Sequence, residues 1–229
     1  MPGLFGLSIS FVTYLRYKQL EATSFFCYTP FVSPITCVFF GRSGAGKGTQ
    51  AALLIELLKQ KDPNRQTIYV ETGKRFRDFI ERGEPYTSGR VRQVIDNGGL
   101  MPAFFPIWMW SGLIIDKLKT GQEHMLLDGV CRRPEEAPVL DSALRFYGRE
   151  KTLILMIEVH HQSAKDRLLA RGRVDDHEQK IAERMRWFEN DVLRAVKFFE
   201  NNSDYRFVRI NGDQTIEEVF ADVRKAIGI

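Results

Sequence analysis

Residues 41–50 constrain this chain more than any other stretch, because their sequence, GRSGAGKGTQ, contains the pattern GxxxxGK. An apolar run at 35–40 precedes them, and a helical pattern follows at 51–58. A glycine-rich turn between a strand and a helix directs successive backbone N–H groups, and the N-terminus of the helix, at one point in space. The stretch therefore predicts a phosphate-binding loop.

Three glycines and a lysine carry this prediction. Gly41, Gly44 and Gly46 allow backbone conformations and a close approach that a side chain would obstruct. Lys47 supplies a point charge that can reach the outer phosphates of a nucleotide. A chance glycine turn is the alternative, and the flanking strand and helix argue against it.

The string GKGTQ is narrower than a general phosphate-binding loop. The general pattern has Ser or Thr directly after the lysine, whereas here Gly48 intervenes before Thr49. The string resembles the nucleoside monophosphate kinase family, most closely the adenylate kinases, whose loop commonly reads GxPGxGKGTQ. Ser43 stands in the position of the proline. The resemblance implies a donor nucleotide site made of Gly44, Ala45, Gly46, Lys47, Gly48, Thr49 and Arg167.

Length and composition fit one domain with small insertions. The 229 residues are 44% hydrophobic, which is enough to bury a core. The formal charge of +4 suits anionic ligands, but it is too small and too evenly spread to predict nucleic-acid binding. Cys27, Cys37 and Cys131 lack CxxC spacing, so they predict neither a disulfide framework nor a zinc site and favour a reducing compartment. We expect a cytoplasmic monomer without stable membrane insertion.

Residues 1–34 precede the first predicted strand and are rich in Phe, Tyr, Ser and Thr. Their apolar run at 3–15 is too short to span a membrane, and no basic region precedes it as in a secretory signal. We interpret residues 1–34 as a poorly ordered extension or a misassigned start. A packed arm and a targeting or membrane-surface segment are the alternatives. The nucleoside monophosphate kinase domain is expected at 35–229.

Apolar runs separated by helical patterns predict the rest of the fold. Strands are expected at 35–40, 66–71, 124–128, 151–159 and 205–210. Helices are expected at 51–58, 74–81, 90–96, 102–119, 163–170, 177–201 and 215–227. This alternation predicts an α/β fold with a five-stranded parallel sheet and ligands at the carboxyl ends of its strands. The resemblance implies a P-loop three-layer fold with a helical NMP-binding insertion at about 72–101 and a short lid.

Thr72 and Gly73, followed by Arg77, resemble the TGDxxR segment with which adenylate kinases hold the acceptor monophosphate. A bidentate guanidinium on a phosphate explains the use of arginine. Lys74 replaces the usual acid, and a solvated helical arginine is the alternative for Arg77. Residues 99–102, GLMP, resemble a second acceptor segment, whose backbone lies near the base and ribose. The resemblance implies an acceptor site made of Thr72, Gly73, Arg77, Met101, Gly129, Arg132 and Glu136.

Asp128 ends an apolar strand and opens the string DGVCR, which resembles the family signature DGFPR. The resemblance implies that Asp128 holds water ligands of Mg²⁺, the expected cofactor, and that Arg132 contacts the acceptor phosphate. Val130 and Cys131 depart from the signature. A cis peptide bond at Cys131, in the place of the proline, would cost about 3 to 4 kcal/mol, so either the bond is trans or the strain is retained. A reactive thiol is the alternative to a plain substitution.

Glu136 stands four residues after Arg132, where the family has a glutamine that reads the acceptor adenine. An amide can donate to adenine N1 while accepting from the adenine amino group, whereas an ionised carboxylate can only accept. Guanine presents N1–H and an amino group side by side, so Glu136 favours a GMP-like acceptor. The neighbouring Glu135 leaves this alignment ambiguous.

Arginines gather in and around the string ARGRVDD at 170–176, which resembles the lid of the family, expected here at about 171–176. A single residue, Gly172, separates two of these arginines, so closure and water exclusion are expected to be weaker than usual. Asp175 follows the RxDD pattern of the family. A solvated helix end is the alternative. The resemblance implies that the catalytic residues are Lys47, Arg132, Arg171, Arg173 and Arg184.

The matched segments run from about 36 to 229 in family order. They imply reversible phosphoryl transfer from ATP·Mg to a nucleoside monophosphate, with AMP as the first choice (ATP + AMP to 2 ADP). The alternatives are a kinase for GMP or a pyrimidine monophosphate, and a nucleotide-binding regulatory protein with little transfer activity. The departures from the family pattern favour the regulatory protein. The retained lysine, acid and arginines argue against it, because a binding module needs no cationic cage.

Overall fold

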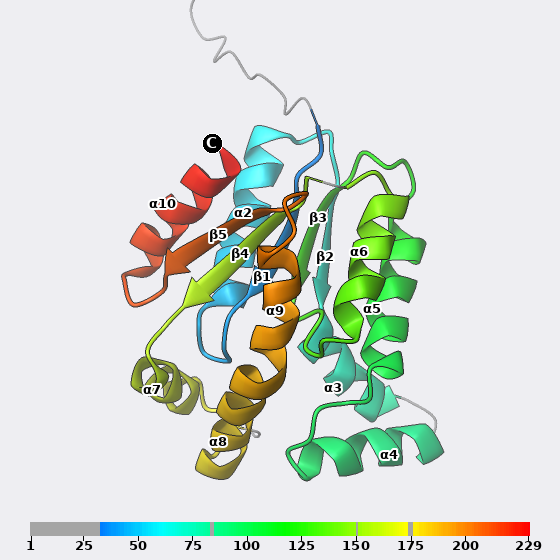
Figure 1. The fold of residues 1–229 in the computed structure, drawn as a ribbon, viewed down its shortest axis with the longest axis vertical. Helices are drawn as coiled ribbons and strands as arrows, with labels where there is room; N and C mark the ends of the chain where they lie inside the picture. Colours follow the sequence, from blue (N-terminus) through cyan, green and yellow to red (C-terminus); the bar gives the residue numbers. More distant parts are fainter. Residues whose placement is uncertain (1–32, 83–84, 150, 174–175) are drawn as a thin grey trace, which may run out of the picture. The chain divides into compact units, whose positions relative to one another are not determined.

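The computed structural model describes residues 33–82, 85–149, 151–173 and 176–229 (Figure 1). The interpretation of residues 1–34 therefore falls almost entirely outside the described residues and stays a prediction. Within the described part, five strands form one sheet in the order β2-β3-β1-β4-β5, and every neighbouring pair is parallel. The strands are β1 (Thr36–Phe40), β2 (Thr67–Glu71), β3 (His124–Asp128), β4 (Leu153–Glu158) and β5 (Arg206–Asn211). The predicted five-stranded parallel α/β fold is confirmed.

Burial explains why the central strands read as continuous apolar runs in the sequence. All residues of β1 and β3 are buried, as are the first five residues of β4. A parallel sheet has helices on both faces, so its central strands show no alternation of apolar and polar residues. The edge strand β5 is more exposed and carries two arginines.

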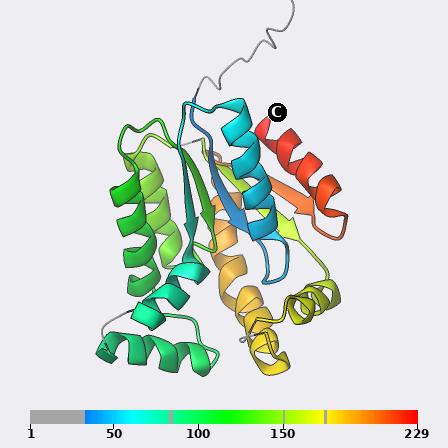
Figure 2. The ribbon, with the colours of Figure 1, turned by 180° about the vertical axis from the view of Figure 1, so that it is seen from behind.

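Helices cover both faces of the sheet. The described helices are α2 (Lys47–Lys61), α3 (Thr72–Arg82), α4 (Pro85–Asp96), α5 (Phe104–Lys117), α6 (Glu136–Phe146), α7 (His161–Arg171), α8 (Glu178–Trp187), α9 (Leu193–Glu200) and α10 (Ile216–Ile227). Figure 1 shows α6 and α9 in front of the sheet, and Figure 2 shows α2 and α10 on the opposite face. The strands point with their carboxyl ends toward α3, α4, α7 and α8.

The main core lies between the sheet and α5, α6 and α9. Val38 and Phe40 of β1 pack there with Trp110, Leu140 and Phe199 from the three helices. A smaller cluster joins α3 and α4 to α5, and its buried members are Phe76, Val91, Phe105 and Met109. The insertion at 72–101 therefore has an apolar contact of its own with the body of the domain.

Three elements differ from the expectations. The helix α6 was not expected, and α4 begins at Pro85 rather than near residue 90. The helix expected at 177–201 is divided by a π-helical segment, Phe188–Val192, between α8 and α9. A π-helical segment changes the residues per turn, so the two halves bury different faces. The capping box of α10 is present, with Thr215 and Glu218 bonded to each other's backbone N–H groups.

Two further findings concern membrane and redox chemistry. None of the described helices combines the length and apolar character needed to cross a bilayer. Cys37 and Cys131 are buried free thiols.

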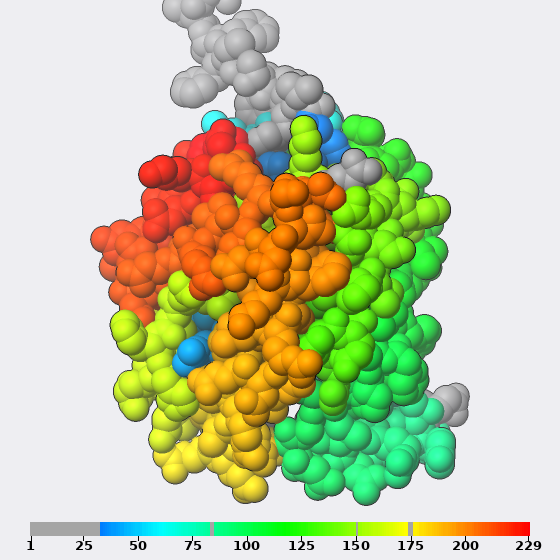
Figure 3. Space-filling model, viewed as in Figure 1, coloured from blue at the N-terminus to red at the C-terminus, as the bar shows by residue number. Residues whose placement is uncertain are grey.

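Figure 3 shows part of the blue segment, which contains the phosphate-binding loop, at the surface between α7 and the elements α8 and α9.

Candidate active site

The glycine-rich loop connects β1 to α2, which begins at Lys47. Gly44 has φ +85°, and a Cβ there would lie 2.5 Å from the carbonyl oxygen of Ala164. Gly46 has φ +91° and caps the helix, with no atom within 4 Å of where its Cβ would be. The loop therefore needs glycine at Gly44 for close packing and at Gly46 for its backbone conformation, and it leaves space over the N-terminus of α2.

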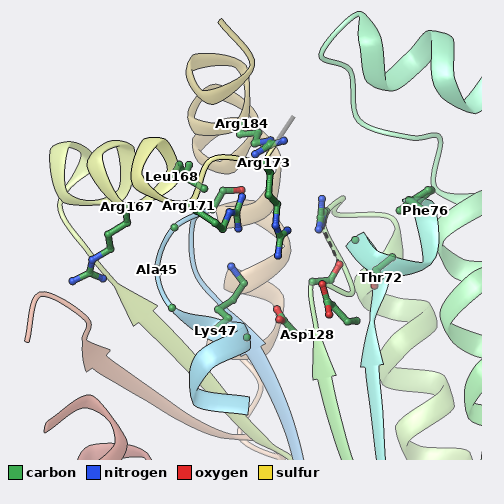
Figure 4. Close-up of a pocket in the computed structure, with 18 of the residues that line it drawn as sticks. Ala45, Lys47, Thr72, Phe76, Asp128, Arg167, Leu168, Arg171, Arg173 and Arg184 are labelled. Carbon is green, nitrogen blue, oxygen red and sulfur yellow. Dashed lines mark hydrogen bonds between the residues drawn. The ribbon is translucent and has the colours of Figure 1, made fainter. Parts of the chain in front are cut away.

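Lys47 lies over this loop rather than pointing away from it. Its Nζ donates hydrogen bonds to the carbonyl oxygens of Gly41 over 2.8 Å and Arg42 over 3.1 Å. An ammonium has three N–H donors, so the same group can also face a phosphate held by the loop. Figure 4 shows Lys47 pointing into the space between the loop and the arginines of the lid region.

Asp128 ends β3 next to the start of α2. Its Oδ2 accepts a hydrogen bond from Tyr69 Oη over 3.2 Å and would lie 3.7 Å from a Cβ on Gly48. Burial, the Asp128 charge and the Glu71 charge raise the pKa of Tyr69, which therefore stays a hydrogen-bond donor. The carboxylate of Asp128 is thus fixed beside the phosphate-binding loop.

The acceptor side of the cavity is built from the ends of β2 and β3. A Cβ on Gly73 would lie 3.5 Å from Arg77 Nη1 and 3.8 Å from Arg132 Nη2. Arg77 pairs with Glu71 over 3.3 Å, and Arg132 Nε donates to the carbonyl oxygen of Gly129 over 3.1 Å. The two guanidinium groups therefore converge on the turn at Gly73, where a bidentate phosphate contact is possible.

Arg133 and Glu136 connect the DGVCR loop to the rest of the acceptor side. Arg133 donates from Nε to the carbonyl oxygen of Met101 over 2.7 Å and from Nη2 to that of Leu100 over 2.9 Å. Glu136 Oε1 accepts from the backbone N–H groups of Arg132 and Arg133 over 3.2 and 3.0 Å. Burial raises the pKa of Glu136, although these bonds oppose the shift. Arg133, which sequence reasoning did not select, thus fixes the Met101 segment against the loop.

The structure distinguishes Glu136 from Glu135 as the candidate site residue, a choice that the sequence alignment left ambiguous. Glu136 is 1% exposed and lines the cavity, whereas Glu135 is exposed and does not line it. Oε2 of Glu136 is buried and makes no hydrogen bond within the usual distance and angle. The buried Trp110 side chain also interacts with this carboxylate and opposes the rise of its pKa, so Oε2 can accept from Trp110 or from a ligand.

Cys131 does not have the environment of a reactive thiol. It is fully buried, and burial followed by the nearby Glu136 charge raises its pKa well above the usual value. Its φ of +57° lies in the left-handed region, the single such case among the described residues other than glycine. The described chain has no cis peptide bond, so the bond at Cys131 is trans. The hypothesis of a reactive thiol receives no support, because the thiolate needs an exposed or electropositive site.

Asp176 organises the arginines of the short lid. It accepts two hydrogen bonds of 2.8 Å from Arg171 and one of 2.8 Å from Arg184, and its oxygen also lies 3.3 Å from the backbone nitrogen of Arg173. Burial opposes ionisation of Asp176, but the hydrogen bonds from Arg171 and Arg184 outweigh it and lower the pKa. Sequence reasoning quoted Asp176 without giving it a role. Asp175, to which the RxDD pattern drew attention, lies outside the described residues.

Arg167 stands apart from the other arginines. Its Nη2 donates to the carbonyl oxygen of Gly212 over 2.9 Å, in the turn between β5 and α10. Figure 4 shows Arg167 directed away from the group formed by Arg171, Arg173 and Arg184. Arg167 and the Gly212 turn therefore form a wall of the cavity away from the other arginines.

The cationic groups lie close enough to affect one another. Burial lowers the pKa of Lys47, Asp128 opposes this shift, and the positive charges of Arg132 and Arg171 add to it. Burial likewise lowers the pKa of Arg132, and the charge of Arg184 contributes in the same direction. Like charges brought together at the end of a sheet favour an anionic ligand, which would relieve their repulsion.

The phosphate-binding loop and most of the arginines described above surround one cavity of about 1200 Å³. The residues of the predicted site that line it are Gly44, Ala45, Gly46, Lys47, Gly48, Thr49, Thr72, Gly73, Arg77, Met101, Asp128, Gly129, Arg132, Glu136, Arg167, Arg171, Arg173 and Arg184. Segments far apart in the sequence thus meet at the carboxyl ends of the strands, as expected for a sheet of this type. The role of each residue remains a prediction.

Metal binding at this cavity depends on few protein ligands. Among the described residues, no cluster of three or more His, Cys, Asp and Glu side chains could hold an ion alone. Magnesium commonly keeps several waters and binds through one or two carboxylates together with substrate phosphates. Asp128, fixed beside the loop, fits that role.

The parallel sheet, its P-loop and a second phosphate-binding side facing the loop define a P-loop kinase of the nucleoside monophosphate class. The family model described as adenylate kinase matches residues 39–204. The chain belongs to the adenylate kinase family.

Known relatives agree with this assignment along nearly their whole length. An adenylate kinase of Thermus thermophilus is 30% identical over 197 residues, which cover 84% of this chain and 96% of the relative. An adenylate kinase of Corynebacterium diphtheriae is 31% identical over 192 residues, covering 83% and 98%. One from Flavobacterium psychrophilum is 33% identical over 190 residues, covering 81% and 94%. The chain is similar to these enzymes across the whole domain.

Proposed function

We propose that this enzyme transfers a phosphoryl group reversibly from ATP·Mg to AMP, giving two ADP. The observation that carries the proposal is the single cavity in which the P-loop faces a second pair of phosphate-binding arginines, Arg77 and Arg132. A cavity with phosphate sites on both sides suits transfer between two nucleotides. The relatives are named adenylate kinase, which supports adenine nucleotides on both sides.

The donor nucleotide is proposed to bind along the P-loop. Backbone N–H groups of Gly44, Ala45 and Gly46 and the N-terminus of α2 would hold its phosphates. Gly48 and Thr49 continue this surface into the first turn of the helix. Arg167 is hydrogen-bonded to the backbone of Gly212, so the base of the donor would lie against the surface that this guanidinium and the turn form together.

The acceptor monophosphate is proposed to bind at the ends of β2 and β3. Arg77 and Arg132 would hold its phosphate, with the Gly73 turn allowing a close approach. Thr72 is buried and its hydroxyl has no hydrogen-bond partner, which leaves it available to the acceptor. The base and ribose would lie along Met101, Gly129 and Glu136, which line the same cavity.

Phosphoryl transfer requires little covalent chemistry, so catalysis depends on alignment and on cations around the transferred group. Burial, followed by the charges of Arg132 and Arg171, lowers the pKa of Lys47, so these cationic groups lie within electrostatic reach of one another. Together with Arg173 and Arg184, they would stabilise the charge spread over the equatorial oxygens. No general base is needed for a phosphate nucleophile.

Mg²⁺ would be held by water ligands on Asp128 and by the donor phosphates. When bound, the ion neutralises phosphate charge and orients the oxygens for an in-line displacement. The hydrogen bond from Tyr69 fixes the carboxylate that would accept from those waters.

A second acceptor, GMP, is favoured by one observation. Glu136, in the cavity wall, has a buried Oε2 without a hydrogen bond of ordinary geometry, although the Trp110 side chain interacts with the same carboxylate. An ionised carboxylate could accept from N1–H and the amino group of guanine but could not donate to adenine N1. A neutral carboxyl could both donate and accept, and would suit adenine.

The test is a coupled assay of ADP formation from ATP·Mg with AMP, GMP, CMP, UMP or dTMP, together with a control that contains no acceptor. The proposal expects the highest kcat/KM with AMP and little turnover without acceptor. Preference for GMP or a pyrimidine monophosphate would replace the acceptor while keeping the reaction. Binding of ATP without acceptor-dependent turnover would favour the regulatory alternative.

We further propose that the enzyme acts as a cytoplasmic monomer and binds neither nucleic acid nor membrane. The small net charge of +4 supports the absence of nucleic-acid binding. Sedimentation of the full chain with and without nucleotides would test the oligomeric state.

A further inference from the structure

One face of α8 contacts the turn that follows α4, although the two are far apart in the sequence. Lys180, Glu183 and Trp187 are spaced three and four residues apart, which puts them on one side of the helix. Asp96 ends α4 and Gly98 lies in the turn that follows it, and both belong to the acceptor insertion expected at 72–101. Figures 1 and 2 both show α8 and α4 at the end of the domain where the strands terminate.

Each member of this face makes its own contact. Lys180 Nζ lies 3.2 Å from Asp96 Oδ1. Trp187 Nε1 donates a hydrogen bond to the carbonyl oxygen of Gly98 over 3.2 Å. A Cβ on Gly98 would lie 1.4 Å from Glu183 Oε2, so the Glu183 carboxylate packs directly on the glycine. Because Gly98 also has φ +68°, the turn is suited to glycine by conformation and by contact.

Trp187 also contacts the catalytic side of the cavity. The guanidinium carbon of Arg132 lies 5.8 Å from the centroid of its ring, within the range of a cation–π interaction. The next residue, Phe188, has the guanidinium of Arg42 at 5.3 Å from its ring. Trp187 ends α8 and Phe188 begins the π-helical segment. The junction therefore contacts Arg132, which lines the cavity, and Arg42 of the glycine-rich loop, which is not among the cavity-lining residues.

These contacts give Trp187 two functions that a purely packing side chain would not have. Its N–H holds the insertion through Gly98, and its ring faces Arg132. It is partly exposed, packs against the edge of the main core and also lines the cavity. A shift of the turn would therefore move the ring that faces Arg132.

We propose that Trp187 is a positioning residue for the acceptor: it couples the docking of the Gly98 turn on α8 to the orientation of the Arg132 guanidinium. The proposal rests on the proposed function, since it takes Arg132 as the ligand of the acceptor phosphate. Trp187 itself touches neither reacting atom. It acts through Arg132 and through the backbone of the insertion.

Two substitutions separate the two contacts. Trp187→Phe retains an aromatic ring for Arg132 and removes the N–H donor, so the KM for the acceptor is expected to rise about threefold. Trp187→Leu removes both contacts, and the same KM is expected to rise about 10- to 30-fold. The KM for ATP should change by less than about twofold in both variants, because the hydrogen bond and the ring contact that the substitutions remove are with Gly98 and Arg132. Trp108→Phe is the matched control, since Trp108 is exposed on α5.

A double-mutant cycle with Arg132→Lys tests whether Trp187 acts through Arg132. Lysine retains the charge but loses the planar guanidinium. If the ring orients that guanidinium, Trp187→Leu should change the acceptor KM by less than about threefold in the Arg132→Lys background. A merely structural role predicts additive effects instead, with both nucleotide KM values and the melting temperature affected together.

The decisive measurements are steady-state kinetics with each nucleotide varied and calorimetric titration of the acceptor into the full chain. A selective loss of acceptor binding in Trp187→Leu, non-additive with Arg132→Lys, supports the proposal. An unchanged acceptor KM, or equal losses for donor and acceptor, overturns it. Failure of the proposed function is distinct, because the unsubstituted enzyme would then show no acceptor-dependent turnover at all.

Discussion

Arg171 donates two parallel hydrogen bonds to Asp176, from Nε to Oδ2 and from Nη2 to Oδ1, each 2.8 Å long. A bidentate pair fixes the plane of the guanidinium as well as its position. The side chain of Asp176 is fully buried, and it also accepts from Arg184. Because the connection between α7 and α8 is short, a buried carboxylate, rather than a long mobile lid, holds these arginines at the cavity.

Substitution of this carboxylate should therefore reduce turnover more than nucleotide binding. Asp176→Asn removes the charge that orients Arg171 and Arg184, and kcat is expected to fall about 100-fold. The free energy of unfolding should fall by about 2 kcal/mol, since two arginines lose their charged partner. Steady-state kinetics and urea denaturation measure the two effects. Asp166→Asn, an exposed aspartate on the same helix as Arg171, is the control, and equal effects in both variants would contradict this role.

Lys47 should be the most sensitive position in the P-loop. Lys47→Gln keeps a hydrogen-bond donor near the carbonyl oxygens of Gly41 and Arg42 but removes the positive charge. We expect kcat to fall about 100- to 1000-fold, because the charge acts on the transferred group. Lys59→Gln makes the same change at an exposed position on the same helix and should leave kcat within about twofold. Near-normal kcat in Lys47→Gln would remove the lysine from the proposed mechanism.

The sheet and the phosphate-binding loop could be predicted because local sequence determines them. The buried strands β1, β3 and β4 read as continuous apolar runs, and the GxxxxGK turn follows one of them directly. The arginines proposed for the acceptor, Arg77 and Arg132, could be selected only through the family resemblance. A single arginine has no sequence periodicity that distinguishes a ligand-binding side chain from a solvated one. The convergence of those residues on one cavity follows from strand order, which single-sequence patterns do not encode.

The residues that were missed act through contacts between distant segments. Trp187 and Gly98 are 89 residues apart, and Arg133 is 33 residues from Leu100 and 32 from Met101. Asp176 was quoted beside Asp175, but its burial depends on how α7 and α8 pack. The π-helical segment at 188–192 rotates the side chains that follow it about the helix axis, and its sequence contains no Gly or Pro that would predict it. None of these features leaves a periodic or compositional signal.

His124 should make the stability of the fold sensitive to acid. It is fully buried, its Nδ1 accepts from the backbone N–H of Ile35 over 2.9 Å, and burial lowers its pKa to about 4. The unfolded chain has a histidine pKa near about 6.5. Between these values the unfolded state binds a proton that the native state does not, so stability falls as the pH drops from about 6.5 to about 4, by up to about 3 kcal/mol.

Urea denaturation at several pH values measures this effect of His124. His124→Asn can keep an acceptor for Ile35 but does not titrate, so the loss of stability over this pH range should become smaller. His161→Asn changes an exposed histidine and should leave the pH dependence unaltered. An unchanged slope in His124→Asn would mean that another group causes the acid sensitivity.

Glu136 should determine both the preferred acceptor and part of the pH dependence. Glu136→Gln retains an oxygen that can accept from the backbone N–H groups of Arg132 and Arg133 and adds an amide donor. The amide can donate to adenine N1, so the ratio of kcat/KM for AMP to that for GMP should rise about tenfold or more. Glu135→Gln makes the same change at an exposed neighbour, and this ratio should not move. No gain in AMP use by Glu136→Gln would remove Glu136 as a reader of the base.

Because the pKa of Glu136 is raised in the folded state, its ionisation determines whether the free energy of unfolding rises or falls with pH. Between the unfolded and folded pKa values, the native state binds more protons than the unfolded state, so stability falls as the pH rises through the folded pKa. Glutamine has no such titration, and Glu136→Gln should therefore be more stable than the unsubstituted enzyme at pH 8. This advantage should disappear below a pH of about 4.3, the usual unfolded value. Urea denaturation at pH 8 and pH 4 compares the two, and an advantage that is the same at both pH values would mean that ionisation of Glu136 costs the fold nothing.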